Sequence, residues 1–243
     1  MRTPRIYHST EISLNSIVAL ESDAANHIAR VLRMKAEQAV TLFNGDGFNY
    51  HGLIVEISKK NVSVNIHCAE QVENESPLKI HLAQGISRGD KMDFTIQKSV
   101  ELGVTDITPI FTERCGVKLN GERLEKKHQQ WQKIAISACE QSGRARIPKI
   151  HFPMRLSEFL SQKTEQLKLN LHPRATTSVK GLSMPESGVR FIIGPEGGLD
   201  DNEIESTLNA GYQEILLGPR VLRTETAALT LLSALQLQFG DLA

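Results

Sequence analysis

Three features of the sequence predict an α/β fold preceded by a small β-barrel. Short strand-like runs dominate the chain before a polar linker at residues 71–77. After this linker, apolar runs alternate with segments of helical spacing, which is typical of a mostly parallel sheet covered by helices. Two glycine-rich segments, residues 194–198 and 217–227, each follow an apolar run and precede a helix-like stretch. Turns of this kind meet at one edge of a sheet and form a crevice in which α/β proteins usually hold a ligand.

The first part of the chain contains the strand signals. Strands are predicted at residues 40–43, 53–57 and 62–66. Residues 44–47, Asn-Gly-Asp-Gly, are strong hairpin-turn chemistry. A short helix, capped by Ser22 or Asp23, is expected to run toward Arg33. Several short strands in so short a stretch favour a barrel, and we assign it residues 1–72 and the next domain residues 73–243.

The second part alternates strands and helices. Strands are predicted at residues 78–84, 104–110, 167–171, 190–194 and 214–217. Helical spacing joins Met92, Ile96 and Val100, and a longer helix contains Trp131. The segment from Asp200 to Glu203 resembles a capping box, and Thr224 is expected to cap the final helix.

Composition narrows the class of protein. The 243 residues are 40% hydrophobic and 23% charged, which fits a folded chain of one large or two modest domains. The formal net charge is zero, so any binding of nucleic acid needs a local basic face. Three widely spaced cysteines without a C-x-x-C pair predict neither a disulfide framework nor a metal site. No secretory signal and no apolar run of about 18 residues is found, so we expect a cytoplasmic protein without membrane contact.

The glycine segment at residues 194–198 has two interpretations. It lacks the G-x-G-x-x-G pattern and the G-K-[ST] ending, which disfavours a dinucleotide or triphosphate site. It fits a ligand loop about as well as a tight turn that needs glycine for its backbone angles. In the next segment, Arg220 and Arg223 bind a phosphate or form surface pairs with Glu225. His172, which follows another strand, is a candidate general base or an exposed loop histidine.

Basic residues gather near the predicted turns and at the start of the chain. If they share a face with the crevice, they form a phosphate-binding rim, and otherwise they are solvated surface. The candidates for RNA contact are Arg2, Arg5, Arg30, Arg33, Arg88, Arg144 and Arg146. Aromatic residues make up only 5% of the chain, so extensive base stacking is not expected.

Several segments together resemble the SPOUT class of RNA methyltransferases. Within that class the chain resembles the ribosomal RNA small subunit methyltransferase E family, which makes N3-methyluridine in 16S rRNA. The resemblance rests on residues 2–8, 27–33, 87–103, 140–144, 170–174, 194–198 and 217–227. Asp200 stands where the family pattern has serine, and either residue caps a helix.

The resemblance implies a PUA-like barrel that binds RNA, and a SPOUT domain whose end is threaded into a trefoil knot. It implies a homodimer that uses S-adenosyl-L-methionine to methylate one uridine of 16S rRNA (position 1498 in the customary numbering of that RNA) on the assembled small ribosomal subunit. No metal is implied. The cofactor would be held by Leu171, His172, Ile193, Gly194, Glu196, Gly198, Leu217, Gly218, Leu222, Arg223 and Thr224.

A mechanism follows from the resemblance and from the chemistry of uridine. Atom N3 carries a proton, so the enzyme must remove it and stabilise negative charge on the base. Arg220, Arg223 and, across the dimer, Arg114 are nominated to stabilise that charge. Glu196, Glu225 and His172 are candidates to accept the proton, and the sequence does not choose among them.

Three other functions stay open. The chain is alternatively an RNA-binding module without catalysis, which a failure to bind S-adenosylmethionine would indicate. It is alternatively a pseudouridine synthase, although the catalytic aspartate motif of those enzymes is not found. A SPOUT methyltransferase acting on another RNA, such as tRNA, is the third alternative.

Overall fold

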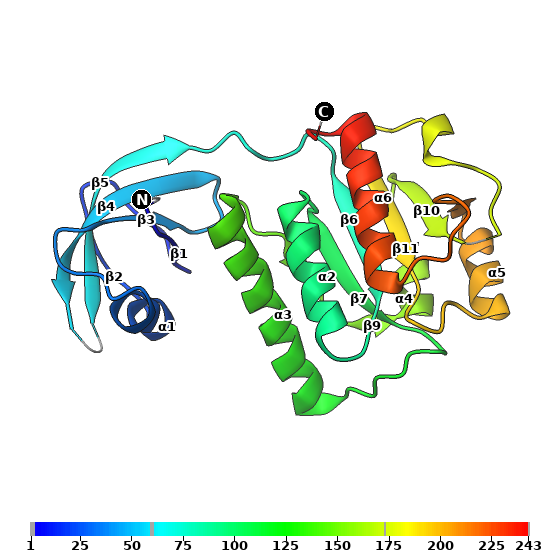
Figure 1. Cartoon of the computed structure of the whole chain (residues 1–243), viewed down its shortest axis with the longest axis horizontal. Coiled ribbons are helices and arrows are strands. Elements are labelled where there is room, and N and C mark those ends of the chain that lie inside the picture. The colour runs from blue at the N-terminus through cyan, green and yellow to red at the C-terminus, as the bar shows by residue number, and fades with distance from the viewer. Residues whose placement is uncertain (1–2, 59–60, 173, 243) are drawn as a thin grey trace. The chain divides into compact units, whose positions relative to one another are not determined.

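The computed structural model describes residues 3–58, 61–172 and 174–242, which fall into two units (Figure 1). The N-terminal unit runs to Glu75 and also contains Cys139–Ile147. The α/β unit contains the rest, residues 76–138 and 148–242. The predicted division between residues 72 and 73 stays a prediction, as do the roles assigned to each part.

A five-stranded sheet forms the N-terminal unit. Its elements are β1 (Arg5–Tyr7), β2 (Ile17–Ala19), α1 (Ser22–Asn26), the π-helical turn η1 (His27–Val31), β3 (Ala39–Phe43), β4 (Phe48–Ile57) and β5 (Val62–Gln71). The strand order is β1-β3-β4-β5-β2, in which only the β1–β3 pair is parallel. Gly45 and Gly47 take positive φ in the predicted β3–β4 turn. Ile28, Leu42 and Ile54 lie in the buried core beneath the sheet.

The cap predicted for the first helix is wrong. Glu21 is the N-cap residue, and it makes no side-chain cap bond, whereas Ser22 and Asp23 lie inside the helix. The carboxylate of Glu21 instead accepts hydrogen bonds from the backbone N–H and the hydroxyl of Ser9. The Glu21 side chain is therefore bound to Ser9, twelve positions earlier, instead of capping the helix.

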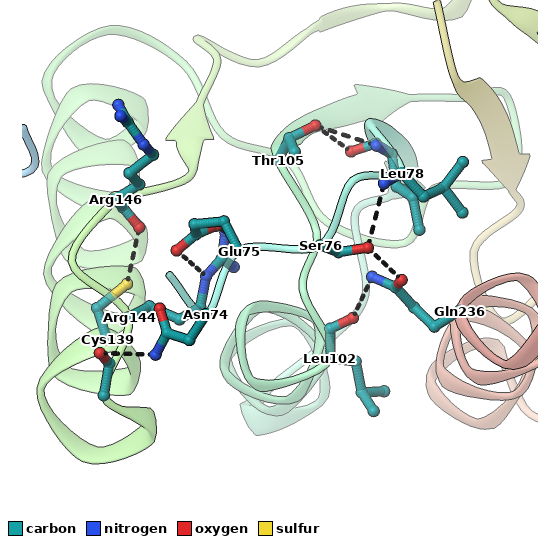
Figure 2. A network of polar contacts seen from close by, with 12 residues as sticks. Asn74, Glu75, Ser76, Leu78, Leu102, Thr105, Cys139, Arg144, Arg146 and Gln236 are labelled. Atoms are coloured by element: carbon teal, nitrogen blue, oxygen red, sulfur yellow. Dashed lines mark hydrogen bonds and ion pairs between the residues drawn. The ribbon is translucent and has the colours of Figure 1, made fainter. Parts of the chain in front are cut away.

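The segment Cys139–Ile147 is bound into the N-terminal unit by polar contacts. The Arg5 guanidinium donates to the carbonyl of Cys139 at 2.8 Å, and Glu140 accepts the Tyr7 N–H at 2.9 Å. Arg144 is paired with Glu75 at 2.6 Å (Figure 2). These contacts are made by residues more than 60 positions apart, so the segment belongs to this unit through its contacts rather than its place in the sequence.

A parallel sheet with helices forms the α/β unit. Its elements are β6 (Ile80–Gly85), α2 (Asp90–Glu101), β7 (Asp106–Phe111), α3 (Gly121–Ser142, whose last residues belong to the N-terminal unit), β8 (Lys149–Ile150), β9 (Met154–Arg155), α4 (Leu156–Ser161), β10 (Leu167–Leu171), η2 (Val179–Gly181), β11 (Val189–Ile193), α5 (Asp201–Asn209), β12 (Gln213–Ile215) and α6 (Thr224–Phe239). The order is β12-β10-β11-β6-β7-β8, with β9 beside β7, and every pair in it is parallel. The predicted α/β fold is confirmed, and the trefoil knot stays a prediction.

Helices cover both faces of this sheet. Helices α2 and α6 pack against each other (Figure 1). Ala83 of β6 and its neighbour Ile192 of β11 point to the opposite face of the sheet from Gln84. There they pack in a hydrophobic cluster with Phe159 of α4 and with Tyr212. Because both faces are covered, β6 and β11 are buried along their whole length, including the polar residues His81, Gln84 and Arg190.

Candidate active site

Three segments that follow β10, β11 and β12 meet in one pocket of about 530 Å³ in the α/β unit. The strands are parallel neighbours, so their carboxyl ends lie at the same edge of the sheet. The lining consists of residues 170–172, 174, 193–199, 216–218 and 220–224, with Lys91, Arg114, Asp201, Ile204 and Ala227. The crevice predicted from the glycine-rich turns is therefore present.

Neighbouring segments hold the glycine loop at residues 194–198 from two sides. The Glu196 carboxylate accepts the backbone N–H of Arg88 at 3.0 Å and lies 3.7 Å from the ammonium of Lys91. On the other side, Arg114 Nη1 donates to the carbonyls of Gly197 and Leu199, at 3.1 and 3.3 Å. The predicted capping box then starts α5, with Asp200 accepting from the Glu203 N–H and Glu203 from the Asp200 N–H.

Glycine is needed in two ways around this loop. A side chain on Gly85, at the end of β6, would place its Cβ 2.4 Å from the backbone nitrogen of Pro195. Only glycine therefore lets the strand and the loop come so close. Gly198 and Gly218 have φ of +69° and +77°, and a Cβ on either would meet no atom within 4 Å. Their backbones border open space, as expected of a loop that approaches a ligand.

The segment before α6 carries exposed basic residues, and its helix cap differs from the predicted one. Arg220 and Arg223 both line the pocket and are exposed. Arg223, not Thr224, is the N-cap residue of α6, and its side chain makes no cap bond. The predicted cap at Thr224 is wrong because its hydroxyl donates to the carbonyl of Gly194 at 2.6 Å. That bond joins the two glycine-rich segments.

His172 is held at the end of β10. Its backbone N–H donates to the carbonyl of Ile215, and its Nδ1 lies 3.5 Å from a carboxylate oxygen of Glu214. A carboxylate beside one ring nitrogen helps to orient an imidazole. Glu225, the third candidate base, is not part of the pocket lining, whereas Glu196 and His172 are.

The pocket is locally basic although the chain is neutral. Among the residues that the structure describes, five lysine and arginine side chains line it, against the two carboxylates of Glu196 and Asp201. Leu171, Ile193, Leu217 and Leu222 supply apolar surface between these charges. The site combines apolar walls, backbone groups and a basic edge, a combination suited to a nucleoside ligand beside a polyanion.

The structure brings every predicted cofactor and charge-stabilising residue to this pocket. The cofactor candidates in its lining are Leu171, His172, Ile193, Gly194, Glu196, Gly198, Leu217, Gly218, Leu222, Arg223 and Thr224. Arg220 and Arg114 join them, the latter in the pocket of its own chain. The roles of these residues, including that of Arg114 across a dimer, stay predictions.

The predicted RNA contacts are divided between the two units. Arg30, Arg33 and Arg146 are exposed on the N-terminal unit, and Arg88 is exposed on the α/β unit. Arg2 lies outside the described residues. Arg5 and Arg144 are bound within the N-terminal unit, by backbone carbonyls and by Glu75, and Arg144 is only 5% exposed. Their side chains are used to hold that unit together.

A row of polar side chains crosses β11, β6 and β7 near the amino ends of these strands. His81 of β6 lies between Arg190 and Asp106 in register. Its ring stacks on His151, and its Nε2 lies 2.8 Å from the hydroxyl of Thr108. Burial, together with nearby Arg190, lowers the pKa of His81 to about 3. Burial opposes ionisation of Asp106, but the hydrogen bond from His151 and the proximity of His81 bring its pKa below the usual value.

Sequence reasoning missed several residues of the site. Lys91, Asn170, Arg174 and Ala227 line the pocket without having been assigned to it. Gln84, fully buried at the end of β6, donates to the Thr224 hydroxyl at 2.9 Å. A polar residue that ends an apolar strand was the available signal.

In the described part of the chain, no helix is long and apolar enough to cross a membrane, and no cluster of three metal-binding side chains occurs.

Two family models match the chain. Residues 74–236 match an RNA methyltransferase domain, and residues 20–66 match an RNA methyltransferase PUA domain. A ribosomal RNA small subunit methyltransferase E from Buchnera aphidicola is 39% identical, over 99% of this chain and 95% of that protein. The Bacillus subtilis protein of the same name is 32% identical, over 90% of both.

Solved structures agree with these matches. A Legionella pneumophila methyltransferase, in complex with the bound cofactor SAM, is 47% identical with a TM-score of 0.96, over 100% of both chains. A Neisseria gonorrhoeae ribosomal RNA small subunit methyltransferase E, bound to S-adenosyl methionine, is 38% identical with a TM-score of 0.93, over 100% of both chains. With its pocket, its PUA and methyltransferase domains and these relatives, the chain belongs to the ribosomal RNA small subunit methyltransferase E family.

Proposed function

We propose that this protein binds S-adenosylmethionine in the pocket of its α/β unit and methylates N3 of one uridine in 16S rRNA. One observation carries the proposal: three separate turns form a single pocket in a chain with an RNA methyltransferase domain. The enzyme contributes by placing N3 in line with the methyl group and by stabilising the negative charge that develops on the base.

The residues present fit this cofactor. The pocket volume lies within the range of about 300–1,000 Å³ that is usual for small-molecule sites. Ile193, Leu217 and Leu222 offer apolar surface for a purine ring, while glycine backbone at residues 194 and 198 offers polar groups without side chains. When bound, S-adenosylmethionine supplies a methyl group on a positively charged sulfur.

The chain's own residues must activate the uridine. The base has to leave its pair or its stack before N3 is accessible. The guanidinium groups of Arg220 and Arg223, exposed at the pocket, stabilise the negative charge that develops on the base when N3 loses its proton. Glu196, which the Arg88 N–H and Lys91 hold in place, and His172, beside Glu214, remain the two pocket candidates that accept this proton.

The rest of the proposal concerns partners. The N-terminal unit binds RNA through exposed arginines such as Arg30 and Arg33. The substrate is the assembled small ribosomal subunit, and the enzyme works as a cytoplasmic homodimer with a knotted SPOUT domain. The family resemblance supports these statements, and each is open to direct measurement.

The test is methyl transfer from labelled S-adenosylmethionine to small subunits from cells that lack this enzyme. Nucleoside mass spectrometry should find N3-methyluridine at one position of 16S rRNA. Label in tRNA alone would favour the alternative RNA substrate, and failure to bind S-adenosylmethionine would favour a binding module without catalysis. Either result would overturn the proposal.

The charge hypothesis is tested by Arg223→Ala. Loss of a guanidinium that stabilises the transition state is expected to lower kcat by roughly 10²- to 10³-fold. Calorimetry of S-adenosylmethionine binding shows whether the cofactor is still held. Normal binding together with normal turnover would remove Arg223 from catalysis.

A further inference from the structure

Gln84 is buried beneath the pocket without lining it. It lies at the end of β6, its side chain is fully buried, and its Nε2 donates to the Thr224 hydroxyl at 2.9 Å and to the carbonyl of Gly85 at 3.1 Å. The amide orientation is determined by Gly85, because a carbonyl oxygen can only accept. The amino group of Gln84 therefore faces both partners.

Thr224 passes this contact on to the pocket. A hydroxyl has one hydrogen, and Thr224 uses it on the carbonyl of Gly194 at 2.6 Å. Its oxygen is left to accept from Gln84. The result is a directed chain of hydrogen bonds from Gln84 to Thr224 to Gly194, which joins the end of β6, the start of α6 and the loop after β11.

The free energy of folding does not explain why a glutamine stands at position 84. Its Oε1 is buried and has no hydrogen-bond partner among the described residues, an arrangement that costs desolvation free energy. The other fully buried glutamine, Gln236 near the end of α6, differs. Its Oε1 accepts from Ser76 at 2.6 Å and its Nε2 donates to Leu102 at 2.9 Å (Figure 2).

We infer that Gln84 is a positioning residue for cofactor binding, acting through Thr224. The chain of hydrogen bonds fixes the Gly194 carbonyl and sets the spacing between the loop at residues 194–198 and the first turn of α6, both of which line the pocket. Thr224 belongs to the pocket by position, but its hydroxyl is engaged by protein groups on both sides. This inference rests on the proposed S-adenosylmethionine pocket.

The experiment measures the Kd of S-adenosylmethionine by calorimetry and the Tm of each variant. Gln84→Leu and Thr224→Val remove one link each and should weaken binding about tenfold, the effect of one lost hydrogen bond of ordinary strength. Thr224→Ser keeps the hydroxyl and should restore binding to within about twofold of the wild type. The KM for S-adenosylmethionine should rise in the two weakened variants while the KM for RNA stays unchanged.

Gln236→Leu is the matched control. It removes a buried amide with both ends bonded, so the Tm should fall by several degrees while cofactor affinity stays unchanged. Gln84→Leu should lower cofactor affinity and leave the Tm nearly unchanged, because Gly85 keeps a second donor in Ser87. If Gln84→Leu and Thr224→Val bind like the wild type, or if Thr224→Ser binds no better than Thr224→Val, the inference fails. A wild type that does not bind S-adenosylmethionine would instead overturn the proposed function.

Discussion

Two arginines of the N-terminal unit and two of the α/β unit do different work. In the N-terminal unit, Arg5 and Arg144 donate to carbonyls and to Glu75, and Arg144 is almost completely buried. In the α/β unit, Arg220 and Arg223 are exposed at the edge of the pocket. A basic residue near a predicted turn is therefore a candidate RNA contact only if its partners leave it accessible, and folding determines those partners.

The largest expected effect is that of Arg144→Ala. It leaves the Glu75 carboxylate without its buried partner, so the free energy of unfolding should fall by about 3–5 kcal/mol. Urea unfolding followed by circular dichroism measures this change. Arg146→Ala, at an exposed neighbour, is the control and should change it by less than about 0.5 kcal/mol. Equal effects of the two variants would mean that the buried pair does not hold the unit together.

The next effect concerns His81, a buried histidine of the α/β unit. Unfolded His81 takes up a proton below about pH 6.5, whereas folded His81 stays neutral down to about pH 3. The unfolded state therefore binds more protons, and lowering the pH from 7 to 5 should reduce stability by about 2 kcal/mol. Asp106, whose pKa lies below the usual value, adds to this loss only at more acidic pH.

The fluorescence of Trp131, the single tryptophan, reports unfolding of the α/β unit. His81→Gln should flatten the pH dependence of the free energy of unfolding between pH 7 and 5. A variant as pH-sensitive as the wild type would place the responsible group elsewhere.

The smallest expected effect concerns the close approach of Gly85 to the backbone of the glycine loop. Gly85→Ala forces a Cβ against the backbone of Pro195 and should weaken S-adenosylmethionine binding about tenfold, or about 1.4 kcal/mol. Gly181→Ala, where a Cβ meets nothing within 4 Å, is the control and should bind normally. Calorimetry on both variants decides, and unchanged binding by Gly85→Ala would mean that this close approach does not shape the pocket.

Local patterns predicted much of the fold. The alternation of strands and helices after residue 77, the capping box at Asp200 and Glu203, and the turn with Gly45 and Gly47 all depend on neighbours in sequence, and the structure confirms them. The glycine segments also predicted the pocket, because parallel strands bring their carboxyl ends to one edge.

Long-range contacts explain what the sequence could not show. Ser22, Asp23 and Thr224 are ordinary cap residues, yet the first two lie inside their helix and the hydroxyl of Thr224 binds Gly194, 30 residues away. Thr224, which accepts from Gln84, and Glu75, which accepts from Arg144, lie 140 and 69 positions away from them. No local pattern contains such pairs.

Hydrogen exchange with and without S-adenosylmethionine tests the central claim most directly. If the turns after β10, β11 and β12 form one cofactor site, the ligand should slow amide exchange at residues 170–172, 193–199 and 216–224 together, and leave β3, β4 and β5 of the N-terminal unit unchanged. Slowed exchange in only one of these turns, or only in the N-terminal unit, would contradict the account.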